Sequence, residues 1–175
     1  MAKLDREFLD ACKNNDIVRV QELINNGANI NCKGLFETPL LIASRIGSEQ
    51  LVKLLLDNGA NANELSYDTT PIIETILFGC KKELQGKKIK TFFSSRYYKV
   101  LDMLLDNGAD VTVEDGDGKS AVCHIVEKGL VNLLGTLFIE KSKISQDKLW
   151  ECANKVLENG TQAGRYKMAS AFPER

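Results

Sequence analysis

The sequence predicts an all-α solenoid of stacked helix-turn-helix units, and two repeated signals carry the prediction. The first is a Gly-Ala pair that recurs at Gly27, Gly59 and Gly108. The second is a helix-start signal at Thr38, Thr70 and Ser120. The first two members of each series lie 32 residues apart. A helix pair of this size cannot bury its own apolar side, so neighbouring units must stack on one another.

The unit at 34–66 shows why each element is expected. Thr38 can cap a first helix, and Pro39 suits the first helical position, where no amide donor is needed. Gly47 breaks that helix, and Ser48 can cap a second one, whose leucines recur at helical spacing. Gly59 is the expected left-handed stop.

A period near 33 residues with a helix start of the T-P-L-H-x-A type is typical of ankyrin repeats. The segments TPLLIA, TPIIET, LLLDNGANAN and LLDNGADVT resemble that family. The resemblance implies an ankyrin-repeat solenoid of about four to five units within a single domain, 1–175, and a function in binding rather than catalysis.

The unit at 3–31 departs from the pattern as a terminal unit should. Arg6 stands in the threonine position and Asn15 in the glycine position, so the start of the unit is more polar. The outer face of a terminal unit meets water and not another repeat.

The unit at 67–114 contains an insertion at 80–96, after Gly79. We expect the insertion to lengthen both helices and to form a projection at their far end. Between Lys81 and Lys99 there are seven basic residues and one acid. One interpretation is a contact element for an acidic partner, and the other is a solvated loop whose aromatics fold back onto the helices. The possible insertion contacts are Lys87, Lys88, Lys90, Phe92 and Phe93.

Two further units complete the expected stack. Ser120 starts the unit at 115–142, whose second helix is expected from Leu130 to Ile139. The segment 143–175, with a helix over 146–158, is interpreted as a degenerate closing unit that covers the apolar end of the stack.

Composition indicates an ordinary protein without general affinity for polyanions. The net charge is −1, which gives no attraction to nucleic acid or to an anionic membrane. The start of the chain, MAKLDREFLD, is too polar for a signal peptide. We therefore expect the protein in the cytoplasm, or in a host cytosol if it is a secreted effector. The five cysteines are scattered without metal-ligand spacing and are interpreted as reduced.

Catalytic groups are scarce. His124 is the single histidine, which excludes a multi-histidine metal site and leaves little for triad chemistry. The DGDGK segment at 115–119 lacks the spacing of a phosphate loop or a calcium loop and is interpreted as a turn between units. We expect no enzyme activity, no cofactor and no metal.

The resemblance places the binding residues in the turns before each first helix and just before each helix-ending glycine. The turn positions in this sequence are Leu35, Phe36, Glu37, Tyr67, Asp68, Asp117 and Lys119. The helix-end positions are Arg45, Ile46, Leu77, Phe78, Glu127 and Lys128. Many of these are bulky and apolar, and exposed apolar clusters mark interaction sites. We expect about half of them to pack inward instead.

These observations leave three functions open. The leading one is a monomeric, non-catalytic module that binds a protein partner through an apolar concave face. A narrower form is a dedicated inhibitor, immunity protein or effector that occludes a partner enzyme. The third is nucleic-acid binding through the basic insertion at 81–99, against which the near-neutral net charge counts.

Overall fold

The computed structural model describes residues 3–85 and 88–130, together with Leu133, Ser145, Asp147, Glu151 and Asn154. The backbone of the inserted segment is described on both sides of 86–87, but its side chains from 82 to 92 are not. The expected closing unit at 143–175, including the helix at 146–158, falls outside the described residues apart from these isolated positions, as does most of the helix expected after Leu130.

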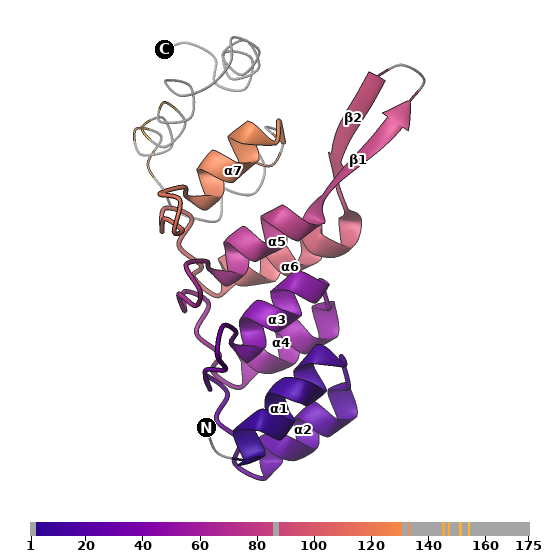
Figure 1. Ribbon diagram of the computed structural model, residues 1–175, viewed down its shortest axis with the longest axis vertical. Coiled ribbons are helices and arrows are strands. Elements are labelled where there is room, and N and C mark those ends of the chain that lie inside the picture. The colour runs from indigo at the N-terminus through magenta and orange to yellow at the C-terminus, as the bar shows by residue number, and fades with distance from the viewer. Residues whose placement is uncertain are drawn as a thin grey trace.

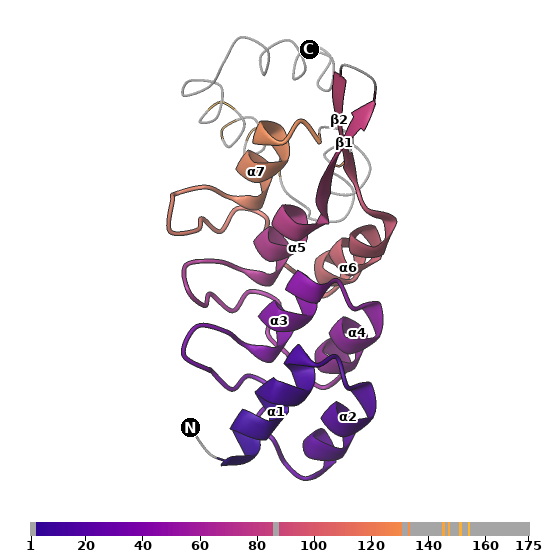
Figure 2. The same ribbon diagram turned by 45° about the vertical axis from the view of Figure 1, so that its right-hand side comes forward.

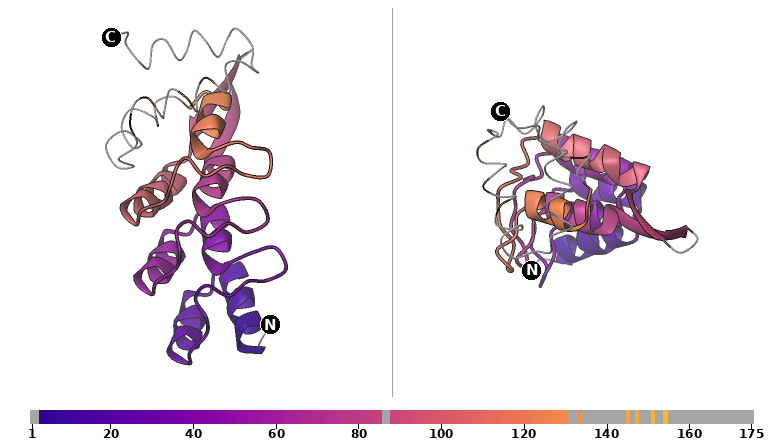
Figure 3. Two further views of the ribbon diagram at one scale, coloured as in Figure 1. Left: turned by 90° about the vertical axis from the view of Figure 1, so that its left-hand side faces the viewer. Right: turned by 90° about the horizontal axis from the view of Figure 1, so that it is seen from above.

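The described residues form a stack of antiparallel helix pairs (Figure 1). The pairs are α1 (Lys3–Lys13) with α2 (Ile17–Asn25), α3 (Pro39–Ile46) with α4 (Glu49–Asp57), and α5 (Pro71–Gly79) with α6 (Ser95–Asp106), followed by α7 (Ala121–Glu127). The first helices, α1, α3, α5 and α7, form one layer, and the second helices, α2, α4 and α6, form the other (Figure 2). The turns between units project beside the layer of first helices (Figures 2 and 3).

The helix starts follow the expected capping chemistry. The side-chain oxygens of Thr38, Ser48 and Ser120 each accept a hydrogen bond from the amide three residues later. Pro39 occupies the first turn of α3, and Gly47 ends that helix in the left-handed region with φ 71°. The helix-start and helix-stop predictions for the second unit are therefore confirmed.

The insertion takes a form that the sequence prediction missed. It is an antiparallel hairpin of β1 (Cys80–Gln85) and β2 (Lys88–Phe93), in which Cys80 pairs with Phe93. Both helices of this unit are longer than those of the second unit, since α5 has 9 residues against 8 in α3 and α6 has 12 against 9 in α4. The expected projection is present, because the hairpin extends from the end of α5 opposite to the turns (Figure 3).

Gly79 has a different role from the other helix-ending glycines. The chain leaves α5 in an extended conformation at Cys80 rather than through a left-handed residue. A Cβ at position 79 would overlap the ring of Phe93 and would lie 2.7 Å from Cβ of Tyr97. Gly79 therefore lets the base of the hairpin pack directly onto α5.

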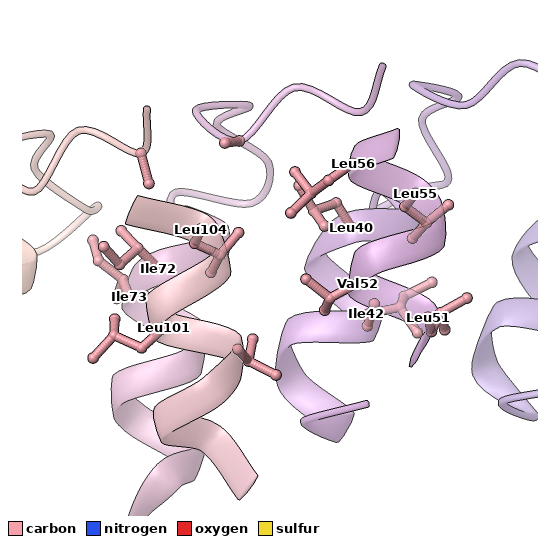
Figure 4. Packing of buried hydrophobic residues seen from close by; sticks show 14 of the residues in the cluster. Leu40, Ile42, Leu51, Val52, Leu55, Leu56, Ile72, Ile73, Leu101 and Leu104 are labelled. Carbon is pink, nitrogen blue, oxygen red and sulfur yellow. The ribbon is translucent and has the colours of Figure 1, made fainter. Parts of the chain in front are cut away.

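The core runs through the stack as one cluster. Figure 4 shows Ile72 and Ile73 of α5 beside Leu101 and Leu104 of α6, and the equivalent aliphatic set of α3 and α4 next to them. All four of these side chains are almost completely buried. Each unit thus supplies one apolar layer, and its stability depends on the layers above and below.

Asparagines tie the turns of successive units together. Asn31 donates from its amide nitrogen to the Gly59 carbonyl (3.1 Å) and accepts from the Asn61 amide (2.9 Å). Asn63 donates to the Gly108 carbonyl (2.9 Å) and accepts from the amide of Asp110. These hydrogen bonds fix the bases of successive turns relative to one another, and this positions the surface at the turn tips.

Candidate functional site

The tips of the inter-unit turns carry large exposed apolar side chains. Leu35 is 92% exposed, Tyr67 71% and Phe36 56%. The rings of Phe36 and Tyr67, from adjacent turns, make an edge-to-face contact with centroids 4.8 Å apart and planes at 68°. We call the row of exposed tip residues the turn ridge. Its members are Leu35, Phe36, Leu65, Tyr67, Asp68 and Asp117.

Backbone strain accompanies the display of Tyr67. The two central residues of the turn, Tyr67 and Asp68, both have positive φ, 50° and 57°. A residue with a bulky side chain rarely adopts this backbone region, because the conformation costs about 1–2 kcal/mol. The turn is closed by hydrogen bonds in both directions between Ser66 and Thr69 (3.0 and 3.2 Å). Strain of this kind concentrates at functional positions.

Below the ridge, Arg45 of α3 lies at the centre of an ion-pair network. Its guanidinium donates to Glu74 of α5 (2.9 Å) and to Glu37, and its Cζ lies 5.7 Å from the ring centroid of Phe78. Lys13 of α1 also pairs with Glu37 (3.1 Å). The network thus links three successive units and holds Arg45 in one orientation.

Two opposing effects set the ionisation of this network. Burial would raise the pKa of Glu37, but hydrogen bonds from Lys13 and Arg45 outweigh it, and the pKa is lowered. Burial would lower the pKa of Arg45, but the hydrogen bond with Glu74 outweighs it, and the pKa is raised. Glu37 and Arg45 are therefore both charged at neutral pH.

The helix-end residues divide between surface and core. Phe78 is exposed, whereas Ile46 and Leu77 are half-buried and pack against the core. The exposed Phe78 ring lies beside the Arg45 guanidinium, which is paired with Glu37 and Glu74, so charged groups adjoin the apolar helix-end residue.

The fourth unit contributes polar groups. Lys119 pairs with Glu127 (2.8 Å), and Lys128 is half-buried at the end of α7. Asp115 accepts from the amides of Asp117 (3.0 Å) and Lys119 (2.9 Å), so the DGDGK segment is a turn closed by an aspartate.

His124 has a structural partner. Its Nε2 lies 2.6 Å from Oδ2 of Asp115, and both side chains are almost fully buried. Burial alone would raise the pKa of Asp115, but the hydrogen bond with His124 and those from the turn amides lower it. His124 is thus held by a hydrogen bond to the turn that precedes its own helix.

Most of the possible insertion contacts lie outside the residues that the structure describes. Lys87 and the side chains of Lys88, Lys90 and Phe92 lie outside the described part. Phe93 is half-buried against the core and packs at Gly79. For Phe93 the alternative in which an aromatic folds back onto the helices is therefore the correct one.

Sequence reasoning missed several residues of this surface. Leu65 is an exposed member of the turn ridge, and Lys13 and Glu74 complete the Arg45 network. Glu74 could have been identified from the sequence, because it is the one ionisable residue in the apolar segment PIIETILFG. A carboxylate in such a segment needs a cationic partner.

Within the described residues, no helix is long and apolar enough to cross a bilayer. The same residues hold no cluster of three metal-ligating side chains. A family model described as "Ankyrin repeats (3 copies)" matches residues 8–85. This part of the chain consists of ankyrin repeats. The match covers the first two helix pairs, α5 and β1, and the structure extends the stack to α6 and α7.

Curated relatives are larger ankyrin-repeat proteins. An ankyrin repeat protein of fowlpox virus is 35% identical over 121 residues, which cover 66% of this chain and 31% of the relative. An ankyrin repeat-containing protein of Saccharomyces cerevisiae is 31% identical over 139 residues, 71% of this chain and 26% of the relative. An ankyrin repeat, SAM and basic leucine zipper domain-containing protein of Carollia perspicillata is 33% identical over 107 residues. These residues cover 61% of this chain and 20% of the relative. The chain thus spans about a fifth to a third of these relatives.

Proposed function

We propose that the chain is a non-catalytic protein-binding module that holds a protein partner against the turn ridge and the adjoining side of α3 and α5. Ankyrin repeats generally serve protein–protein interaction, and their stacked units present an extended surface for it. The observation that carries the proposal is the exposed Phe36–Tyr67 ring pair, displayed by a strained turn.

Aromatic side chains dominate the energetics of protein interfaces because they bury a large rigid surface with little loss of conformational freedom. In the free protein, Tyr67 gains little from burial in its own fold, since most of its surface meets water. Arg45 adds a second anchor whose orientation is already fixed by Glu37 and Glu74. A preorganised arginine loses less entropy on binding than a free one.

Affinity capture from the native cell, followed by mass spectrometry, tests the proposal. The bait variants are the double change Phe36→Ser with Tyr67→Ser and, as the control, Val18→Ser. Val18 is 72% exposed on α2, in the layer away from the ridge. We expect the partner to remain bound to the wild type and to the Val18 variant and to be lost from the double variant. Circular dichroism and thermal unfolding establish that each variant is folded.

The proposal fails if the folded double variant retains the same proteins as the wild type. A captured enzyme that loses activity when bound would favour the inhibitor over the adaptor form of the function. Because each buried interface aromatic contributes about 2 kcal/mol or more, loss of both rings reduces affinity by about 700-fold or more.

A further inference from the structure

The inter-unit turns are strongly acidic, although the chain as a whole is nearly neutral. The loops 31–37, 63–69 and 110–119 contain two lysines, Lys33 and Lys119. The same loops contain seven carboxylates, at Glu37, Glu64, Asp68, Asp110, Glu114, Asp115 and Asp117. Their net charge is −5, against −1 for the whole protein. The turn side of the stack therefore attracts cations.

Several of these charges are already satisfied within the fold. Lys33 pairs with Glu64, Lys119 pairs with Glu127 of α7, and the Asp115 carboxylate is bonded to His124. Asp68 and Asp117 are exposed, and neither forms an ion pair with any residue in the described part of the chain. Lys119 is attracted electrostatically by Asp117, but its ammonium group donates a hydrogen bond to Glu127.

These two aspartates adjoin the aromatic pair. The Gly116 amide donates to the Asp68 carbonyl (2.9 Å), which joins the third and fourth turns at their tips. A Cβ on Gly116 would lie 2.7 Å from Cβ of Asp68, so the two turns are in direct contact there. Since Asp68 follows Tyr67, the ridge runs from apolar side chains in the second unit to carboxylates in the third and fourth.

We infer that the turn ridge selects a partner segment in which lysine or arginine stands beside an apolar side chain. This inference rests on the proposed function and adds the chemistry of the partner. The apolar side chain packs on Leu35 and Phe36, and the cation lies between the Tyr67 ring and the two aspartates. An arginine or lysine there gains both carboxylate attraction and a cation–π contact with the exposed ring.

The basic hairpin does not compete for this segment. It extends from the end of α5 opposite to the turns (Figure 3). The segment 80–93 contains one acid, Glu83, and five basic residues, Lys81, Lys82, Lys87, Lys88 and Lys90. Like charges would repel a cationic partner from that end. The two ends of the molecule therefore differ in charge preference, and a cationic segment is directed to the turns.

Selection from a phage-displayed library of random twelve-residue peptides on the full chain at low ionic strength tests the inference. We expect the enriched peptides to combine lysine or arginine with an aromatic or aliphatic residue. An enriched peptide is then titrated against three double variants by fluorescence anisotropy. The binding variants are Asp68→Asn with Asp117→Asn, and Phe36→Ser with Tyr67→Ser. The control is Glu22→Gln with Asp57→Asn, which removes two exposed carboxylates from α2 and α4.

We expect the aspartate variant to weaken binding about threefold to tenfold at low salt, since each exposed charge pair contributes up to about 1 kcal/mol, and the difference to shrink at high salt. The control variant should bind as the wild type does. Enrichment without basic residues, no enrichment above background, or an aspartate variant that binds unchanged overturns the inference. Loss of binding in the aromatic variant alone would leave the proposed function standing and remove only the charge selection.

Discussion

Replacing Gly47 with alanine should destabilise the protein more than the same change at Gly59. Both glycines follow a helix, and both have positive φ, 71° at Gly47 and 85° at Gly59. An alanine in this backbone region costs about 1 kcal/mol. The space around the two positions differs. A Cβ at Gly59 meets no atom within 4 Å, whereas a Cβ at Gly47 would lie 2.7 Å from Cζ and 2.8 Å from Cε1 of Tyr97.

The Tyr97 ring has little freedom to move aside. It is buried, and its hydroxyl donates to the Arg45 carbonyl at 2.8 Å. Overpacking of a buried site costs about 1–3 kcal/mol in addition to the backbone term. We therefore expect losses of about 1 kcal/mol for Gly59→Ala and about 2–4 kcal/mol for Gly47→Ala.

Urea unfolding at equilibrium measures both losses, provided that the denaturant slope stays constant. A double-mutant cycle with Tyr97→Leu, which removes Cζ and the hydroxyl, assigns the excess to the ring. In that background Gly47→Ala should cost only the backbone term of about 1 kcal/mol. Equal losses at Gly47 and Gly59, or a loss at Gly47 that persists unchanged with Tyr97→Leu, would refute the reasoning.

Three further outcomes are expected. Arg45→Ala should destabilise the fold by about 1–3 kcal/mol in urea, because it leaves the buried Glu74 carboxylate without its cation, and Arg45→Lys should restore part of the loss. The folded-state pKa of Asp115 lies below the ordinary value of 3.8, so its carboxylate contributes stability above that pH and loses it as pH falls through the folded pKa. Asp115→Asn should therefore flatten the fall in urea midpoint below about pH 4. Burial raises the pKa of Cys12 to about 12, so native-state alkylation followed by mass spectrometry should label the half-buried Cys80 well before Cys12, and equal labelling rates would contradict this.

The local elements of the repeats could be predicted from the sequence because their causes are local. A threonine or serine caps the amide three residues later, and a glycine accepts positive φ, whatever the rest of the chain does. Thr38, Ser48 and Gly47 behave as their residue types require. The terminal unit follows the same rule, since Asn15 adopts φ 53° in the glycine position.

The insertion could not be assigned in the same way. Its strands contain six residues each, and five of these twelve residues are charged, so neither helical nor strand periodicity is strong. The hairpin is tied to the stack at its base, where Phe93 and Tyr97 fill the space left by Gly79. That contact joins residues on either side of the inserted segment and is absent from any local window.

The sequence by itself determined the repeat, the helix ends and the positions of the turn tips, because these follow from spacing and from capping. Only the tertiary structure decided which tip residues meet. The Phe36–Tyr67 contact, the pairing of Arg45 with Glu74 and the inward packing of Ile46 and Leu77 all join different units. They depend on how closely the units stack and on which charges lie opposite each other, and those distances are fixed by the packing of the whole solenoid.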